Sequence, residues 1–437
     1  MTLAPSSERV VRVAVLGCGN VGSALVGILT DRSDALAVQS GARLEVGGIA
    51  VHDLDRTRGA HIPRGLLTSD AGALVSDPSI DVVVELIGGL VPAGSLVRQA
   101  IEAGKPVVTA NKALLASPEG VALRSLAQQE GVDLLYEAAV AGAIPLVRAL
   151  RESLTGERIH RVMGIVNGTT NFILTKMSEQ GADYADVVAE AQALGLAERD
   201  PTADVEGYDA AAKAAILAGV AFGYDVAAAD VMREGITSIR AVDVEFAERL
   251  GYSVKLLAIV ERTGDDALSV RVHPALVPKS HPLAGVRDAF NAVFIEGETA
   301  GELMLYGQGA GGLPTASDVV GDLIDAVRNR AAGTTAPTPE RLPARLLPES
   351  ELSTQYYISL DVTDRPGVLA SVTRIFGENN VSIRSMEQEG FAGDARLLFV
   401  THVAREGDVR TTLAALAELD TVEEIGGFMR IVGDADS

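Results

Sequence analysis

The segment VVRVAVLGCGNVG at residues 10–22 decides the fold of the first part of the chain. Its first seven residues are mostly apolar and rich in valine, which predicts a buried strand. Glycines follow at positions 17, 19 and 22, and residues 23–29 continue as a helix-compatible stretch. Glycine permits a tight turn at Gly17, close approach of the backbone to a ligand at Gly19, and close helix packing at Gly22. A GxGxxG pattern between strand and helix therefore predicts a helix N-terminus that binds a pyrophosphate, as in dinucleotide-binding domains.

Strands and helices keep alternating beyond this motif. Further strands are predicted at residues 44–51, 82–86, 106–109 and 132–137, and a helix at 93–103. This alternation is typical of a parallel, doubly wound α/β sheet of the Rossmann type. We predict that this nucleotide-binding domain covers residues 1–140.

The pattern changes from about residue 141 to a mixture that predicts an α+β substrate and dimerisation domain over residues 141–330. Helices are predicted at 170–180, 184–194 and 209–222, and strands at 160–166 and 254–262. Glycine is dense again at 307–312, and the helix predicted at 315–330 is expected to pack back on the first domain.

Proline-rich residues 331–352 predict a semi-rigid linker, because proline at this density cannot form a helix or a central strand. Beyond it, residues 353–437 have the size of a domain. Strands are predicted at 355–362, 383–389, 395–402 and 428–432, and helices at 368–379 and 408–418. The order βαββαβ is the ferredoxin-like split motif.

Composition excludes several classes of protein. The 437 residues are 47% hydrophobic, which favours a folded chain over disorder. The net charge is −22 and no basic patch occurs, so nucleic-acid binding is not expected. No apolar run reaches the roughly 18–20 residues needed to span a bilayer, and residues 1–9 lack the apolar core of a signal peptide. We therefore expect a cytoplasmic protein that does not bind membranes.

Metal-binding signals of the common kinds are absent from the sequence. Cys18 is the only cysteine, which excludes an intrachain disulfide and multi-thiolate zinc sites. The six histidines show no spacing typical of metal ligands.

The most informative stretch ends at Lys213, the only charged residue in an otherwise apolar run that extends to Phe222. Asp209 lies four residues before it, so the two side chains share one helix face. An exposed ion pair is the simpler interpretation, but the alanine-rich surroundings do not suit an exposed face. A lysine held among carboxylates near a cofactor can give a proton to the alkoxide formed by hydride transfer. The carboxylates would hold the ammonium group of a substrate.

The choice between NAD and NADP is left open by residues 52–58. Asp53 and Asp55 would favour a ribose hydroxyl, whereas Arg56 and Arg58 could hold a 2′-phosphate. The arginines favour NADP slightly.

The segment AQALGLAERDPTADVEGYDAAAK at residues 191–213 resembles the homoserine dehydrogenase signature at every fixed position. Supporting segments are TANK at 109–112, YEAAVAGAIP at 136–145, VNGTTNF at 166–172 and GQGAGG at 307–312. The resemblance covers essentially residues 10–330. It implies NAD(P)H-dependent reduction of L-aspartate 4-semialdehyde to L-homoserine, a step towards threonine and methionine.

The resemblance also implies roles for single residues. Lys213 is the expected proton donor, and Lys112 is a second candidate that lies near nicotinamide and substrate; without the resemblance, Lys112 would be interpreted as a loop lysine. Glu198 and Asp209 are expected to contact the substrate, with Asp204 close by. Residues expected to bind the cofactor are Gly17, Gly19, Asn20, Val21, Gly22, Ile87, Lys112 and Gly309.

A monovalent metal ion, usually sodium, is a further property implied by the family. Its ligands are mainly backbone carbonyls, and the pattern falls on Glu137, Val140, Gly142 and Ile144. Oxygen ligands suit a hard cation.

The C-terminal unit resembles an ACT domain, an amino-acid-sensing module, on the segments DVTDRPGVLA at 361–370 and NNVSI at 379–383. The turn at Pro366 and Gly367 opens a helix, where free amides can bind a carboxylate. This implies feedback control by an amino acid, with threonine expected, and assembly into a homodimer or homotetramer. A dimerisation domain that binds no effector is the alternative. The candidate effector residues are Asp364, Pro366, Gly367, Val368, Leu369 and Asn379.

Two other functions compete with this interpretation. One is an ACT-regulated dehydrogenase of another amino acid, which would act on an imino or keto acid. The other is an amino-acid sensor that has lost catalysis, although the intact Glu198, Asp209 and Lys213 count against it.

Overall fold

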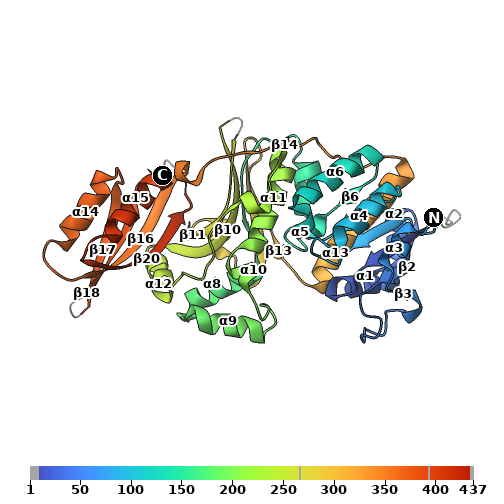
Figure 1. Cartoon of the computed structure of the whole chain (residues 1–437), viewed down its shortest axis with the longest axis horizontal. Coiled ribbons are helices and arrows are strands. Elements are labelled where there is room, and N and C mark those ends of the chain that lie inside the picture. The colour runs from blue at the N-terminus through green and yellow to red at the C-terminus, as the bar shows by residue number, and fades with distance from the viewer. Residues whose placement is uncertain (1–8, 265–266, 392–393, 434–437) are drawn as a thin grey trace. The chain divides into compact units, whose positions relative to one another are not determined.

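The computed structural model describes residues 9–264, 267–391 and 394–433 (Figure 1). The chain forms two compact units. Unit 1 comprises Met1–Arg158, Ala215–Ala229 and Leu305–Pro343, and unit 2 comprises Ile159–Ala214, Asp230–Met304 and Ala344–Ser437. Across the described residues, no helix combines the length and apolar character needed to cross a membrane.

Unit 1 is built on a six-stranded parallel sheet with the order β3-β2-β1-β4-β5-β6. The strand order reverses direction between β1 and β4, the crevice where such sheets bind ligands. The predicted Rossmann-type sheet is thereby confirmed. Its strands are β1 (Val10–Leu16), β2 (Arg43–Ala50), β3 (Leu67–Thr68), β4 (Val82–Glu85), β5 (Val107–Thr109) and β6 (Leu134–Leu135).

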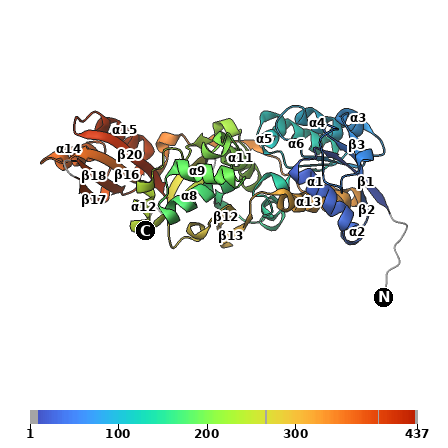
Figure 2. The same cartoon turned by 90° about the horizontal axis from the view of Figure 1, so that it is seen from below.

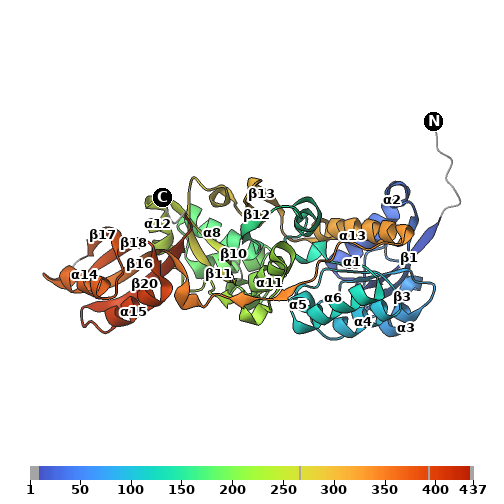
Figure 3. The same cartoon turned by 90° about the horizontal axis from the view of Figure 1, so that it is seen from above.

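Helices cover both faces of this sheet. Val13 and Val15 of β1 are fully buried on one face, in a core shared with α1 and α13. Figure 3 shows α13 running beside α1, and Val319 and Leu323 of α13 belong to that core. The opposite face packs on α4 and α6. The helices are α1 (Asn20–Asp31), α2 (Ser33–Ser40), α3 (Ala71–Ser76), α4 (Ala93–Glu102), α5 (Lys112–Leu115), α6 (Pro118–Glu130), α7 (Leu146–Arg148) and α13 (Gly312–Ala332).

Unit 2 contains an antiparallel sheet whose central strands β10 and β11 pair over their whole length. Helices α8 and α9 lie side by side (Figure 2). The strands are β7 (Ile159–Ile165), β9 (Met232–Arg233), β10 (Tyr252–Thr263), β11 (Ala267–Pro278), β12 (Phe290–Gly297) and β13 (Gly301–Gln308); the helices are α8 (Gly168–Gln180), α9 (Tyr184–Ala193), α10 (Thr202–Val205), α11 (Tyr208–Phe222) and α12 (Ala241–Arg249). The last residues of β13 (305–308) and of α11 (215–222) belong to unit 1.

The C-terminal part of unit 2 has the predicted βαββαβ order, which confirms that part of the fold. Its sheet has the order β20-β16-β18-β17 and buries its own apolar core against α14 and α15. Strand β20 also pairs with β11, so the two sheets of unit 2 are continuous. The elements are β16 (Ser353–Thr363), α14 (Val368–Glu378), β17 (Ile383–Phe391), β18 (Asp394–Thr401), β19 (Ala404–Arg405), α15 (Glu406–Ala417) and β20 (Val422–Ile431).

Two segments differ from what the sequence pattern predicts. The strand expected at 132–137 is only β6, because the chain turns into a single 3₁₀ turn at Glu137–Ala139. The proline-rich segment carries two short strands, β14 (Leu342–Pro343) and β15 (Arg345–Leu346). β14 pairs with β8 (Tyr224–Asp225) and β15 pairs with β11, so backbone pairing fixes this segment locally despite its prolines.

Candidate active site

The glycine loop after β1 is shaped for close backbone approach. Gly17 has a φ of +100°, and a Cβ there would lie 2.6 Å from the carbonyl oxygen of Leu86. A Cβ at Gly22 would overlap the carbonyl oxygen of Gly17. At Gly19, in contrast, no neighbouring atom lies within 4 Å of the Cβ position. Gly19 is the N-cap of α1, and a helix N-terminus carries amides without intrahelical partners that can bind a phosphate.

A cavity of about 750 Å³ opens beside this loop. Its lining includes Gly19, Ser23, Arg56, Arg58, His61 and Gly312. Asp53 is not among the lining residues, because its carboxylate accepts the backbone N–H groups of Asp55 and Arg56 at 2.8 and 3.1 Å. The Asp53 side chain therefore shapes the turn. Arg56 and Arg58 line the cavity, and the Arg58 guanidinium also donates to the carbonyls of Arg56 and Asp53 at 3.0 and 2.7 Å.

Buried Glu85 organises the next loop of the sheet. It is fully buried, and its carboxylate accepts the N–H groups of Ile87 and Gly88 at 2.8 and 2.9 Å and the hydroxyl of Thr109 at 2.6 Å. These bonds hold the ends of β4 and β5 together and leave Ile87 39% exposed beside the glycine loop. Lys112 is exposed at the first position of α5.

The loop of the expected metal ligands has a strained backbone. Ala141 and Gly142 both have positive φ, +63° and +58°. A Cβ at Gly142 would overlap the carbonyl of Gly309, so this loop packs directly on the glycine-rich segment. The structure thus brings the four expected metal residues and Gly309 into one region of unit 1. The carboxylate of Glu137 itself accepts the N–H groups of Val147 and Arg148 at 2.8 and 2.7 Å, which leaves backbone carbonyls as the available ligands.

Acidic groups accumulate next to this loop. Asp322 accepts the N–H of Glu137 at 2.8 Å and is 1% exposed. Burial, together with the nearby charge of Glu137, raises the pKa of Asp322 to about 7 and that of Asp318 to about 8. Among the described residues, Asp318 Oδ2 is a buried oxygen without a hydrogen-bond partner. Several buried carboxylate groups this close together, one with an unpartnered oxygen, provide a suitable environment for a cation.

Lys213 lies at the centre of a buried polar cluster in unit 2. It is 7% exposed, and its Nζ donates to the carbonyl of Val166 at 2.5 Å and to Asp209 Oδ2 at 2.8 Å. The Asp209 carboxylate lies in the first turn of α11, where the helix dipole stabilises negative charge. Asp209 and Lys213 therefore form an ion pair on one face of α11, as their spacing predicts, and the pair is buried and not exposed to solvent.

Asn167, a residue that sequence reasoning left without a role, ties this cluster together. Its Nδ2 donates to Asp204 Oδ1 at 2.7 Å and to Asp209 Oδ2 at 2.9 Å. Its Oδ1 accepts the N–H of Thr170 at 2.9 Å as the N-cap of α8. Two carboxylates against one lysine leave a net negative charge, which suits the ammonium group of an amino acid.

Glu198 lies apart from these bonds. It is exposed on the loop between α9 and α10, and within the described residues its only hydrogen bond is between its backbone carbonyl and Gln192. The structure thus brings Asp204, Asp209 and Lys213 together and leaves Glu198 on the surface.

The candidate effector residues lie around a cavity of about 350 Å³ at the start of α14. Asn379 is not among its lining residues, because it follows the opposite end of α14 and donates to the carbonyl of Ile375 at 2.9 Å. The lining includes Asp364, Pro366, Gly367, Val368 and Leu369.

Asn167 and Glu85 carry weak signals in the sequence. Asn167 precedes a helix-compatible stretch, which is the preferred position of an N-cap, and Glu85 ends a run of three valines. Neither signal reveals which side chains these residues meet.

Family models match three parts of the chain. The model described as homoserine dehydrogenase matches residues 145–324, that of the homoserine dehydrogenase NAD-binding domain matches 17–137, and that of the ACT domain matches 356–421.

Homoserine dehydrogenases with similar sequences span almost the whole chain. The enzyme of Mycobacterium tuberculosis is 50% identical over 98% of this chain and 99% of its own. That of Corynebacterium glutamicum is 50% identical over 97% of this chain and 96% of its own.

Solved structures agree with the sequence matches. The crystal structure of a homoserine dehydrogenase from Thiobacillus denitrificans has a TM-score of 0.92 at 42% identity and covers 97% of this chain and 99% of its own. A hyperthermophilic archaeal homoserine dehydrogenase in complex with NADPH has a TM-score of 0.61 at 29% identity and covers 72% of this chain and 97% of its own. The chain therefore belongs to the homoserine dehydrogenase family, and it is an NAD(P)-dependent oxidoreductase.

Proposed function

We propose that the chain reduces L-aspartate 4-semialdehyde to L-homoserine with Lys213 as the proton donor. The observation that carries this proposal is that Lys213, a residue of α11, is buried and donates hydrogen bonds to Asp209 and to the carbonyl of Val166. A lysine fixed in this way presents its ammonium group in one orientation. Family membership supports the substrate class.

The residues of the chain would bind, orient and protonate the substrate. Asp204 and Asp209 offer carboxylate oxygens to the substrate ammonium group, and Glu198 joins them when substrate is bound. The Lys213 ammonium donates a proton to the carbonyl oxygen as it becomes an alkoxide, and takes it back in the reverse reaction. The bound nicotinamide cofactor supplies the hydride. Lys112 is a second candidate for proton transfer.

NADP is the proposed cofactor, bound at Gly17, Gly19, Asn20, Val21, Gly22, Ile87, Lys112 and Gly309. Arg56 and Arg58 line the nucleotide cavity, and Asp53 does not. The Asp53 carboxylate and the Arg58 guanidinium both form hydrogen bonds within the turn at 53–58. Guanidinium groups at this position favour a 2′-phosphate over a ribose hydroxyl. The archaeal relative in complex with NADPH agrees with this choice.

A sodium ion is proposed at the loop of Glu137, Val140, Gly142 and Ile144. Its carbonyl oxygens and the unpartnered Asp318 Oδ2 nearby have the chemistry that a hard cation prefers. The ion would hold the strained loop in place and offset the buried negative charge.

Regulation and assembly follow from the C-terminal domain. We propose that threonine acts as a feedback effector, with the cavity around Asp364 and Gly367 as its site, and that the chain forms a homodimer or homotetramer in the cytoplasm. We also propose residues 1–140, 141–330, 331–352 and 353–437 as nucleotide-binding domain, catalytic domain, linker and ACT domain.

A direct test measures NADPH oxidation on addition of L-aspartate 4-semialdehyde. Lys213→Met is expected to lower kcat by about 100-fold or more, because general acid catalysis contributes on that order. The Kd for NADPH should stay within a few-fold of wild type. Lys279→Met, at a lysine whose side chain is 51% exposed, is the matched control and should keep wild-type kcat. An unchanged kcat in Lys213→Met would exclude the proposed role.

A further inference from the structure

The turn at residues 205–208 connects two carboxylates of the substrate cluster. Asp204 lies in α10 at the start of this turn, and Asp209 follows the turn in the first turn of α11. The distance and orientation between the two carboxylates therefore depend on the backbone of the 205–208 turn. Residues 233–237, which follow β9, pack against this turn.

Backbone contacts hold the 205–208 turn against the 233–237 segment. The N–H of Ile236 donates to the carbonyl of Val205 at 2.8 Å, and Arg233 NH1 donates to the carbonyl of Glu206 at 2.5 Å. Gly235 lies so close to the turn that a Cβ there would be 2.5 Å from the carbonyl oxygen of Val205. A shift of the 233–237 segment would therefore move the turn with it.

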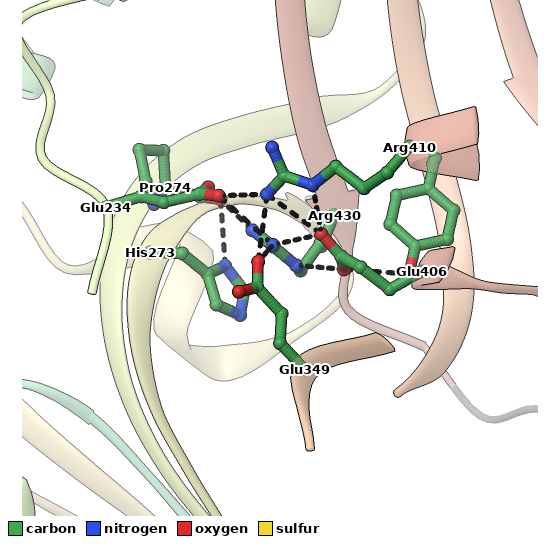
Figure 4. Close-up of polar contacts among 8 residues, drawn as sticks. Glu234, His273, Pro274, Glu349, Glu406, Arg410 and Arg430 are labelled. Atoms are coloured by element: carbon green, nitrogen blue, oxygen red, sulfur yellow. Dashed lines mark hydrogen bonds and ion pairs between the residues drawn. The ribbon is translucent and has the colours of Figure 1, made fainter. Parts of the chain in front are cut away.

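Glu234, inside the same segment, joins an ion-pair network of the C-terminal portion (Figure 4). Its carboxylate accepts from Arg430 at 2.7 and 3.2 Å and from Arg410 at 2.5 Å. Arg430 lies on β20, is 2% exposed and also donates to Glu406 at 2.5 and 2.8 Å. Because the two guanidinium groups occupy these carboxylates, the cluster is an ion-pair network and not a metal site.

The network holds Glu234 as a charged group in a fixed place. Burial opposes its ionisation, but hydrogen bonds and positive charge from Arg430 outweigh burial and hold the pKa of Glu234 at about 2. The N–H of Glu234 also donates to the carbonyl of Val272 on β11 at 2.8 Å. Neutralising one partner of such a pair leaves the buried charge of the other uncompensated, so the surrounding groups must rearrange.

We propose that Arg430 and Glu234 are positioning residues for the reaction. Their ion pair holds the 233–237 segment against the 205–208 turn and thereby sets the position of Asp204 relative to Asp209. The C-terminal portion would then contribute to the shape of the substrate site with no effector bound. This inference rests on the proposed function, because it takes these two carboxylates as the groups that bind the substrate.

Steady-state kinetics of Glu234→Gln in the full chain tests the proposal. The change keeps the size of the side chain and removes its charge. We expect the KM for the semialdehyde to rise about threefold to thirtyfold, the range for coupling through a packed network. The value of kcat should change less than the KM, because Lys213 keeps the Val166 carbonyl as a partner. The KM for NADPH should stay near wild type.

Glu349→Gln is the matched control. Glu349 accepts from the same two guanidinium groups, from Arg410 at 2.9 Å and from Arg430 at 3.4 Å. It lies in a 3₁₀ turn at Glu349–Glu351, outside the 233–237 segment. The control removes one charge from the same network and should leave the KM for the semialdehyde near wild type.

Gly235→Ala reaches the turn without altering a charge. Its Cβ would overlap the carbonyl oxygen of Val205, so this variant should also raise the KM for the semialdehyde more than it changes kcat. Hydrogen–deuterium exchange provides a readout without turnover. Exchange in peptides that cover residues 202–212 should be faster in Glu234→Gln than in wild type and unchanged in Glu349→Gln.

Three results would overturn the inference. The first is a wild-type KM and wild-type exchange in a folded Glu234→Gln. The second is an equal rise of KM in Glu234→Gln and Glu349→Gln, which would indicate a general loss of stability. The third is an unchanged KM in Gly235→Ala, which decides the case if Glu234→Gln does not fold. Melting temperatures establish folding of each variant. Absence of semialdehyde reduction by wild type would instead refute the proposed function, whereas the exchange experiment would still test the coupling.

Discussion

Replacing Asn167 by aspartate tests the hydrogen bonds that hold Asp204 and Asp209, the two carboxylates proposed to bind the substrate, in place. The change preserves the size of the side chain and the oxygen that caps α8 at Thr170. It removes the Nδ2 donor to Asp204 and Asp209 and puts a third carboxylate between them. The perturbation therefore affects hydrogen bonding and charge and leaves packing almost unchanged.

Its magnitude follows from the two lost bonds. Each hydrogen bond to a charged group contributes roughly 1.5–3 kcal/mol, so the loss of two should lower the free energy of unfolding of Asn167→Asp by roughly 3–6 kcal/mol at neutral pH. The neighbouring carboxylates raise the pKa of the new aspartate above its unfolded value. The folded state then binds more protons than the unfolded state, and the stability deficit should shrink as the pH falls through that interval.

Urea unfolding followed by far-UV circular dichroism is the appropriate stability assay, because the chain contains no tryptophan. The KM for the semialdehyde should rise about tenfold or more, while the KM for NADPH stays near wild type. Asn329→Asp is the matched control, since Asn329 Nδ2 donates to Asp133 at 2.8 Å away from the substrate cluster. It should lower stability without changing the KM for the semialdehyde. Stability within 1 kcal/mol of wild type, together with an unchanged KM in Asn167→Asp, would refute the reasoning.

Three further predictions concern the cofactor, a buried lysine and the metal loop. Arg58→Ala should raise the KM for NADPH about tenfold and that for NADH less than threefold; equal effects on both cofactors would argue against a 2′-phosphate site. Burial lowers the pKa of Lys255 to about 8, so the charged lysine costs stability below that pH and the cost is relieved as the pH rises towards 10.5. Wild type should therefore gain on the order of 3 kcal/mol relative to Lys255→Met over this interval, measured by urea unfolding, and parallel pH profiles would contradict this. Gly142→Ala should abolish any increase in melting temperature produced by sodium relative to choline, because its Cβ would overlap the carbonyl of Gly309; a preserved sodium effect would place the ion elsewhere.

Sequence patterns predict the periodic parts of the fold well. The first strand begins and ends as predicted, at Val10 and Leu16, because an apolar run there is bounded by polar residues and glycine. Helix α13 begins three residues earlier than predicted, at Gly312. The glycines there favour a loop in isolation, but proline is well tolerated in the first turn of a helix, and Pro314 lies in it. The strand expected up to Glu137 ends early because hydrogen bonds to Val147 and Arg148 hold that carboxylate in a turn.

In the candidate site, too, contacts between residues close in sequence could be predicted, whereas contacts between distant residues could not. The contact between Asp209 and Lys213 could be predicted because residues four apart meet on a helix. The bonds from Asn167 to Asp209 and from Glu85 to Thr109 span 42 and 24 positions, so no local periodicity indicates them. The contact between Arg430 on β20 and Glu234 spans 196 positions, and no local pattern indicates it either.

The pairing of β20 with β11 has a consequence for anyone who wants to shorten or recombine this enzyme. Because Ala275 and Leu276 of β11 pair with Arg430 and Ile431, the C-terminal portion is joined to the rest of unit 2 by backbone pairing as well as by the linker. Ending the chain at the proline-rich segment would leave the backbone of β11 without these partners. The exposed strand edge would then be prone to aggregation. Chimaeras should therefore exchange β11 together with the C-terminal portion.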